Sequence, residues 1–383
     1  MKITEIRAHP LAFDFDQRVW TAHEPFERAG LILVEVRTDE GIVGFGEVAG
    51  GPQKLVCDLL KSCGEAIRGM DPRGHIEIWQ KLISLTVPRP GGLGNWDGLP
   101  APLQRNHRPQ FMAAMAGIDI ALWDIKGKSA NLPVFRLLGG TRTEVFTYSV
   151  GGFYVEGAPL QSYAQEFAEY VAKGYRAVKL KTGALSLADE LVRIASVREA
   201  IGPDVLFMLD MNAPYDVEGC IRFAKAVEPY DIYWLEEPLH WYLQPADFAR
   251  LAAATPIPLA HGEREWHRFT IRDFIDSGAL KFVQFDATRY GGFTEALRTS
   301  EYAALKGVVI TPHSAPHIHA HLVSAFGDAA FAAESVGREL RHPIHHAIYQ
   351  GGAHFKKDGM LHLTEAPGFG LEIDWKGVEK LRS

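Results

Sequence analysis

The sequence predicts an α/β fold: a TIM-type (β/α)7-8 barrel with an α+β N-terminal capping domain that is completed by the C-terminal tail. Two observations predict the barrel. From about residue 140 onward, strand patterns alternate with helical patterns, as in a parallel sheet with right-handed crossovers. Polar residues also recur about one β-α unit apart at the ends of successive strand patterns, where such a barrel carries its chemistry. These residues are Lys181, Asp210, Glu236, Glu263, Asp286, His313 and Glu334.

The composition excludes several classes of protein. The chain has 383 residues, of which 47% are hydrophobic, and its formal net charge is −7. This balance disfavours a nucleic-acid-binding surface, and three cysteines are too few for a disulfide framework or a cysteine zinc site. Residues 1–13 alternate like a strand rather than forming a signal peptide, and no apolar run has transmembrane length. We expect a cytoplasmic homo-oligomer with no nucleic-acid or membrane partner.

Residues 1–135 are predicted to form the capping domain. Residues 1–50 read as strands with a hairpin turn at 38–41, and residues 51–135 read mostly as helix. A polar and aromatic loop at 16–30 contains Trp20 and His23 and is expected either to contact a ligand or to be a solvated surface loop. A second loop, 87–109, is rich in proline and glycine, and its length is typical of a lid or a partner-contact segment.

Residues 136–350 are predicted to form the barrel. The strand patterns cover residues 144–152, 175–181, 206–212, 232–238, 256–263, 281–287, 307–313 and 329–335. The helical patterns cover residues 159–173, 187–201, 217–228, 245–253, 268–278, 293–306 and 318–326. Ser186 and Asp189 have the spacing of a capping box. Residues 351–383 read as a hairpin and an extended end, outside the barrel, that return to the N-terminal strands.

Two lysines share one face of the strand at 175–181. Side chains alternate along a strand, so Lys179 and Lys181 point opposite to Val178 and Leu180. A K-x-K pair is most often a solvated edge strand, but here carboxylates end the next three strand patterns. Burial and a positive neighbourhood lower the pKa of a lysine and make it a general base. Lys181 is nearer the strand end and is the better base, whereas Lys179 supplies a fixed charge that can bind a substrate carboxylate.

Asp210, Glu236 and Glu263 form an all-oxygen set. Three carboxylates packed together repel one another unless a cation lies between them, and hard oxygen ligands favour Mg²⁺, with Mn²⁺ as a substitute. The alternative is three solvated acids at strand ends.

A histidine and further polar residues also lie at or near the ends of successive strand patterns. Asp286 ends the strand before that of His313, where a carboxylate can fix the histidine tautomer and stabilise its protonated form. Asn212 can bond a substrate hydroxyl group, and Glu334, if protonated, can bond the substrate carboxylate.

These motifs resemble the mandelate racemase subgroup of the enolase superfamily over essentially the whole chain. The matching residues are K-L-K at 179–181, D-M-N at 210–212, E-E-P at 236–238, G-E at 262–263, Asp286, His313 and Glu334. The resemblance implies removal of the proton α to a carboxylate, a Mg²⁺-stabilised enediolate, and Lys181 and His313 as bases or acids on opposite faces. It also implies that Glu236 rather than Glu237 binds the metal; the sequence does not separate them.

The sequence leaves open which reaction follows the formation of the enediolate intermediate. The polar residues of the 16–30 loop suit a polyhydroxylated acid, so we favour a sugar-acid dehydratase, with Trp20 and His23 as substrate-binding residues. The alternatives are a racemase or epimerase of a 2-hydroxy acid and a lactone cycloisomerase. More distant alternatives are a zinc hydrolase, suggested by the alternating His317, His319 and His321, and a non-catalytic binding protein.

Overall fold

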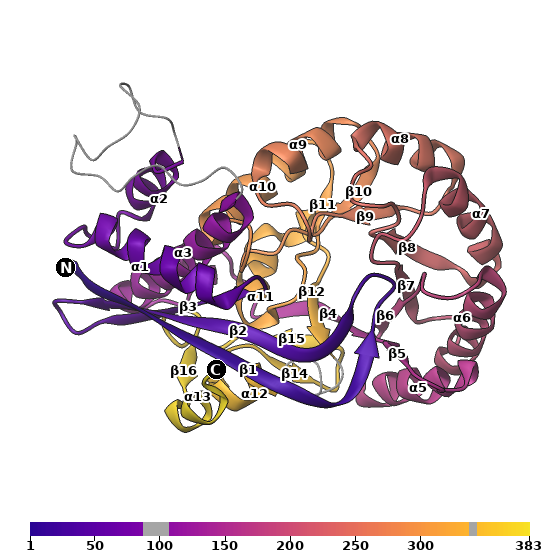
Figure 1. The fold of residues 1–383 in the computed structure, drawn as a ribbon, viewed down its shortest axis with the longest axis horizontal. Coiled ribbons are helices and arrows are strands. Elements are labelled where there is room, and N and C mark those ends of the chain that lie inside the picture. The colour runs from indigo at the N-terminus through magenta and orange to yellow at the C-terminus, as the bar shows by residue number, and fades with distance from the viewer. Residues whose placement is uncertain (87–106, 337–342) are drawn as a thin grey trace.

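The computed structural model describes residues 1–86, 107–336 and 343–383. A helix-covered antiparallel sheet forms one end of the molecule, and a ring of parallel strands surrounded by helices forms the other (Figure 1). The predicted fold class is confirmed.

The capping domain packs helices on one face of an antiparallel sheet. Its elements are β1 (Ile3–Trp20), β2 (Pro25–Thr38), β3 (Val43–Ala49), α1 (Gln53–Ile67), α2 (His75–Ser84) and α3 (Arg108–Ala130). The backbones of β3 and α3 come close because Gly44 and Gly46 carry no side chain on that face. A Cβ atom at Gly46 would lie 2.1 Å from the carbonyl oxygen of Gly117. Side chains alternate along a strand, so Glu47 of β3 points to the opposite face.

The barrel strands and helices alternate in chain order. The strands are β4 (Glu144–Gly151), β6 (Ala177–Lys181), β7 (Leu206–Asp210), β8 (Ile232–Glu236), β9 (Leu259–His261), β10 (Leu280–Val283), β11 (Val309–Ile310) and β12 (Ala333–Val336). The helices are α5 (Tyr163–Lys173), α6 (Leu187–Ile201), α7 (Val217–Val227), α8 (Pro245–Ala254), α9 (Arg268–Asp276), α10 (Phe293–Leu305) and α11 (Pro316–Phe326). β4 pairs in parallel with both β6 and β12. Phe331 N donates to Ile310 O at 2.8 Å, which joins the ends of the ring.

An apolar layer fills the barrel interior below the charged residues. Its members are Tyr148, Ala177, Met208, Trp234, Ala260, Phe282 and Ala332. Met208 and Trp234 each lie two residues before a charged site residue and therefore share its face of the strand. At the start of α6, Ser186 Oγ accepts a hydrogen bond from Asp189 N at 3.2 Å, which confirms Ser186 as the N-cap. The Asp189 carboxylate accepts from Ser186 Oγ at 2.7 Å, so the reciprocal bond of a capping box is not the one that the structure shows.

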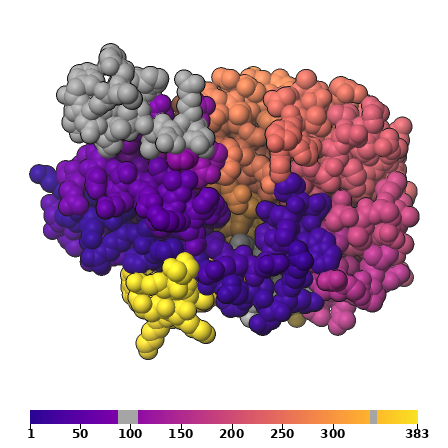
Figure 2. Space-filling model, in the orientation of Figure 1, coloured from indigo at the N-terminus to yellow at the C-terminus, as the bar shows by residue number. Residues whose placement is uncertain are grey.

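The expected loop at 16–30 is instead mostly strand, and this expectation was wrong. β1 continues to Trp20 and β2 begins at Pro25, so residues 14–30 form a hairpin with a turn at 21–24. This hairpin is called the arm here. The arm extends toward β5 (Tyr154–Val155) and lies over one face of the barrel (Figures 1 and 2). There Trp20 pairs with Tyr154 and stacks on its ring, with 6.2 Å between centroids. This long-range pairing extends the strands. Of the second predicted loop, residues 87–106 lie outside the described residues.

The C-terminal tail contacts both parts of the molecule. Its elements are α12 (Pro343–Ile348), β13 (Tyr349–Gly351), β14 (His354–Lys356), β15 (Met360–His362), β16 (Leu371–Ile373) and α13 (Trp375–Leu381). A short helix, α4 (Val134–Leu137), lies between the capping domain and the barrel in the sequence. The β14–β15 hairpin adds to the barrel sheet at β4 and not to the cap, which differs from the expectation. The end of the tail does reach the cap, where Ser383 N donates to Pro10 O at 3.1 Å. The domain limits at residues 135 and 350 stay predictions.

Within the described ranges, no helix has both the length and the apolar character needed to cross a bilayer. The cytoplasmic location and the homo-oligomer stay predictions.

Candidate active site

Strand register aligns the charged residues of neighbouring strands. Lys181 of β6 is the register partner of Asp210 of β7, and Asp210 is the partner of Glu236 of β8. Lys179 shares the inward face because it lies two residues before Lys181. Lys179 is 0% exposed and Lys181 is 2% exposed, so neither lysine belongs to a solvated edge strand.

Asp210, Glu236 and Glu263 form a buried carboxylate cluster. One oxygen of each lies within 4.8 Å of the others. Burial raises the pKa of Glu236 well above its ordinary value against the opposing effect of Lys179, and Asp210 raises it further. Burial acts in the same direction on Asp210, but the lysine charges outweigh it and lower the pKa of that carboxyl. Oxygen ligands that repel one another in this way fit a hard divalent cation such as Mg²⁺.

The two lysines contact different members of this cluster. Lys179 Nζ contacts Glu236 and lies 2.9 Å from Glu334 Oε2. Burial alone would lower the pKa of Lys179, but Glu236 and Glu334 hold it well above its ordinary value. Lys179 therefore stays charged, as its expected role requires. Lys181 Nζ contacts Asp210 Oδ2.

His313 connects Asp286 to the carboxylate cluster. Its Nδ1 atom lies 3.1 Å from Asp286 Oδ2, and its Nε2 atom lies 3.1 Å from Glu263 Oε2. Thr288 holds Asp286 in turn, because its backbone N and its Oγ1 donate to Oδ1 at 2.9 and 2.7 Å. Burial would raise the pKa of Asp286, but Arg289 and His313 hold it below its ordinary range. The ionised carboxylate favours a proton on Nδ1 and leaves Nε2 directed at the cluster.

Two more of the predicted residues border the cluster. Glu334 Oε2 accepts hydrogen bonds from Lys179 and from the Tyr148 hydroxyl group, the latter at 3.0 Å. Asn212 N donates to Asp210 Oδ1 at 3.1 Å. The Oδ1 atom of Asn212 is buried and accepts no hydrogen bond from the described residues.

The structure separates Glu236 from Glu237. Glu237 has a φ of 46°, and its side chain leaves the cluster. Its Oε1 atom lies 2.7 Å from His261 Nδ1, and its Oε2 atom accepts from Arg264 Nε at 2.8 Å. Burial would lower the pKa of His261, but Glu237 and Glu265 raise it to about 9. Glu237 therefore belongs to an ion-pair group beside the carboxylate cluster.

The arm brings His23 to the C-terminal ends of the barrel strands. The His23 ring packs edge-on against Trp241, with 4.0 Å between centroids. Burial lowers the pKa of His23, and the positive charge of Arg264 lowers it further. Trp20, the other predicted substrate-binding residue, stacks on Tyr154 instead.

Phe153 links the arm to Lys181, and the sequence analysis did not identify it. Phe26 of the arm packs edge-on against Phe153, with 6.0 Å between centroids. Lys181 Nζ lies 5.7 Å from the centre of the Phe153 ring, within cation–π distance. The position of the arm therefore bears on the environment of this lysine.

Two residues that hold Glu236 were also missed. Gln284 Nε2 and Trp234 Nε1 both donate to Glu236 Oε2, at 2.6 and 3.1 Å. Trp234 lies two residues before Glu236, and Gln284 lies two residues before Asp286. The two-residue period of a strand is the signal that could have found them.

The three alternating histidines do not converge on one point. His319 Nδ1 lies 2.7 Å from Ser314 O, and His321 Nδ1 accepts from Phe135 N at 3.2 Å. All three lie on α11, where residues two apart do not share a face. Among the described residues, no group of potential metal ligands contains more than one of them. The zinc-hydrolase alternative therefore lacks its site.

Two family models match the chain. The Enolase C-terminal domain-like model matches residues 162–377, and the Mandelate racemase / muconate lactonizing enzyme N-terminal domain model matches residues 13–139. The two matches together cover the cap and the barrel.

Named relatives match over most of the chain. D-galactarolactone cycloisomerase of Agrobacterium fabrum is 32% identical over 398 residues, covering 100% of this chain and 99% of that protein. L-talarate/galactarate dehydratase of Salmonella typhimurium is 32% identical over 316 residues, covering 81% of this chain and 74% of that protein. A crystal structure of a variant of the Salmonella enzyme, liganded with Mg and L-glucarate, has a TM-score of 0.86 at 27% identity and covers 100% of this chain and 92% of that one. The chain therefore belongs to the mandelate racemase/muconate lactonizing enzyme family of the enolase superfamily.

Proposed function

We propose that the protein is a Mg²⁺-dependent dehydratase that converts a sugar acid, an aldonate or an aldarate, to its 2-keto-3-deoxy acid. One observation carries the proposal. Two side chains that can transfer protons contact the same carboxylate cluster at different members, Lys181 at Asp210 and His313 at Glu263. A substrate bound at the cluster would lie within reach of both.

Asp210, Glu236 and Glu263 would hold the Mg²⁺, with Mn²⁺ as a substitute. When bound, the ion supplies positive charge that stabilises the enediolate formed from the substrate carboxylate. The self-repulsion of this buried cluster supports the assignment.

Lys181 and His313 would divide the proton transfers of the dehydration. Lys181 takes the proton α to the carboxylate, and the electron pair of that C–H bond enters the enediolate. Return of the pair expels the β-hydroxyl group, which leaves as water with a proton from His313. The remaining enol rearranges to the 2-keto-3-deoxy acid. Asp286 acts as a positioning residue, because it faces His313 Nδ1 at 3.1 Å.

Lys179, Glu334 and Asn212 would bind the substrate around the reacting carbons. Lys179 stays charged and can pair with the substrate carboxylate. Glu334, if protonated, can donate to the same carboxylate. The buried Oδ1 atom of Asn212 can accept from a substrate hydroxyl group, since no described residue donates to it.

A sugar acid suits the polar groups at the C-terminal ends of the strands. His23 and Arg264 lie there beside Trp241, and Trp20 supports the arm that carries His23. A site that bonds several hydroxyl groups discriminates against an analogue that lacks them, because its own polar groups would be left unpaired. The names of the relatives support the same class of substrate.

A sugar lactone is the second candidate substrate. A relative that aligns over 100% of this chain is named a cycloisomerase of a galactarolactone. The same α-proton abstraction would then be followed by expulsion of the ring oxygen rather than of a free hydroxyl group.

The test is turnover with Mg²⁺ on a stereochemically complete panel of aldonates, aldarates and their lactones, with detection of 2-keto-3-deoxy products, and with mandelate as a separate substrate. We expect at least one acid sugar to be dehydrated far faster than mandelate is racemised. Product from lactones only would select the cycloisomerase. Efficient mandelate racemisation with no acid sugar consumed would overturn the proposal and select the racemase.

A further inference from the structure

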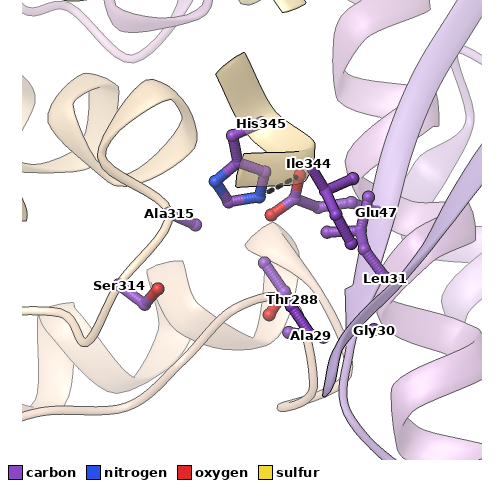
Figure 3. A pocket seen from close by; sticks show the side chains of 10 residues that line it. Ala29, Gly30, Leu31, Glu47, Thr288, Ser314, Ala315, Ile344 and His345 are labelled. Atoms are coloured by element: carbon purple, nitrogen blue, oxygen red, sulfur yellow. Dashed lines mark ion pairs between the residues drawn. The ribbon is translucent and has the colours of Figure 1, made fainter. Parts of the chain in front are cut away.

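Glu47, His317 and His345 meet at the junction of three segments of the chain. Glu47 lies on β3 of the cap, His317 on α11 of the barrel and His345 on α12 of the C-terminal tail. Glu47 Oε2 lies 3.0 Å from His317 Nε2 and 3.3 Å from His345 Nε2. One potential ligand atom from each residue lies within 4.8 Å of the other two. Figure 3 shows the His345 ring facing the Glu47 carboxylate.

The spacing of these atoms matches that of ligands around a metal ion. Ligands about 2.0–2.1 Å from a tetrahedral Zn²⁺ stand roughly 3.3 Å from one another. The separations of the Glu47 oxygen from the two histidine nitrogens are close to this value. Small side-chain shifts would therefore admit an ion.

The hydrogen bonds of Glu47 leave part of the carboxylate unused. His317 and the Tyr349 hydroxyl group approach the same oxygen, Oε2, the latter at 2.7 Å. Glu47 is 1% exposed, yet its Oε1 atom has no hydrogen-bond partner within the part of the chain that the structure describes. A buried polar atom without a partner is costly, and a bound cation would relieve this cost.

A cavity beside the carboxylate gives room for an ion. It has a volume of about 50 Å³ and is bordered by Glu47, His345, Thr288 and Ser314 (Figure 3). A single water molecule needs roughly 10–15 Å³ by this measure. The cavity therefore has room for an ion together with water ligands.

The chemistry of the three ligands differs from that of the proposed Mg²⁺ site. Two imidazoles and one carboxylate form a set typical of Zn²⁺ and other divalent transition metals, whereas Mg²⁺ prefers oxygen ligands only. The Tyr349 hydroxyl group donates to Glu47 Oε2, and a hydrogen bond of this kind orients a carboxylate ligand around a metal.

We propose that Glu47, His317 and His345 form a second metal site, which binds Zn²⁺ or a similar divalent transition metal and joins the cap, the barrel and the C-terminal tail. The site is separate from the carboxylate cluster and uses only His317 of the three alternating histidines. Its ligands come from segments that are far apart in the sequence, so the ion would hold the cap on the barrel.

The site is tested by titrating metal-free, untagged protein with Co²⁺ alone and recording heat and visible absorption. The wild-type chain should bind two equivalents, and one of them should give the stronger visible bands of a low-symmetry nitrogen site. The variant Asp210→Asn removes one proposed ligand of the carboxylate cluster and should retain that nitrogen-type spectrum. Adding His317→Gln or His345→Gln to Asp210→Asn should abolish it.

Matched controls separate metal binding from loss of structure. His346→Gln changes an exposed histidine on the same helix as His345 and should leave the spectrum and stoichiometry unchanged. Tyr349→Phe keeps all three ligands and should weaken binding by roughly 10–100-fold. Circular dichroism of each variant confirms the fold. A nitrogen-type spectrum that survives both histidine substitutions in folded protein would overturn the proposal. So would the absence of Co²⁺ binding by folded Asp210→Asn protein.

Discussion

Lys181 contacts Asp210 directly across two parallel strands, and the two residues are register partners. One carboxylate thus serves the proposed metal site and also orients the proposed base. The adjacent register pair of Asp210 and Glu236 continues the same row. The position of Lys181 relative to the cluster is therefore set by strand register, whereas His313 lies beyond the end of β11.

Removing either proton-transfer side chain should greatly reduce turnover. We expect Lys181→Ala and His313→Asn each to lower kcat by roughly 10²–10⁴-fold, the contribution typical of a positioned acid or base. Far-ultraviolet circular dichroism should show a retained fold. Incubation in D₂O separates the roles, because the variant that keeps the base should still exchange the α proton of the substrate.

The assignment of the bases fails if both variants turn over at near-wild-type rates. In a racemase, each single variant should exchange the α proton of one enantiomer only. In a dehydratase, one variant should retain exchange and lose elimination.

Gln284 should tune the affinity for Mg²⁺ without contacting the ion. It is 1% exposed and donates to Glu236 Oε2 at 2.6 Å. We expect Gln284→Leu to raise the Kd for Mg²⁺ by roughly 10–100-fold, since removal of a hydrogen bond that orients a ligand has effects of this size. Calorimetric titration of metal-free protein with Mg²⁺ measures this Kd. Gln165→Leu, at an exposed position on α5, is the matched control, and equal Kd values for the two variants would contradict the assignment.

The barrel and its charged positions could be predicted because both follow local rules. Strand alternation directs Lys179 and Lys181 to one face, and the spacing of the β-α units brings successive strand ends to one end of the barrel. Trp234 and Gln284 lie two residues before Glu236 and Asp286, so the two-residue alternation of a strand would also have predicted that their side chains face the site. The sequence was sufficient to predict these positions because a fixed spacing along a strand, or between strand ends, decides where each side chain lies.

The remaining features depend on contacts between distant segments. Trp20 continues a strand because it pairs with Tyr154, and nothing near Trp20 in the sequence records that partner. Glu237 leaves the carboxylate cluster through a positive φ and pairs with Arg264, which the E-E-P motif does not reveal. Glu47 contacts two histidines from two other segments, so no local sequence motif predicts the cluster of Glu47, His317 and His345.

Gly46 should be required for the packing of the cap. A Cβ atom there would lie 2.1 Å from Gly117 O, in the backbone of α3. Neither β3 nor α3 can shift easily, so we expect Gly46→Ala to lower the free energy of unfolding by about 1–3 kcal/mol. Chemical denaturation measures the change. At Gly30 of β2 a Cβ atom would meet only the end of the Gln53 side chain, at 3.3 Å, and no backbone atom, so Gly30→Ala should cost less. The reverse order would refute the packing argument.

His321 should make the fold sensitive to acid. It is 1% exposed, and its Nδ1 atom accepts a hydrogen bond from Phe135 N at 3.2 Å. Burial lowers the pKa of His321 from 6.5 to about 3. The folded state therefore binds a proton more weakly than the unfolded state. The contribution to stability is fully present above pH 6.5 and is lost as the pH falls toward about 3.

The variant His321→Asn isolates this contribution. The asparagine oxygen can accept the same hydrogen bond from Phe135 N, but it does not titrate. Between pH 6.5 and about 3, the stability of the wild-type chain should fall relative to the variant by up to about 1.4 kcal/mol per pH unit. Urea denaturation at a series of pH values measures both chains, and other titrating groups cancel in the difference. Parallel stability curves across this range would show that His321 is protonated in the folded protein as readily as in the unfolded chain, against the effect expected of its burial.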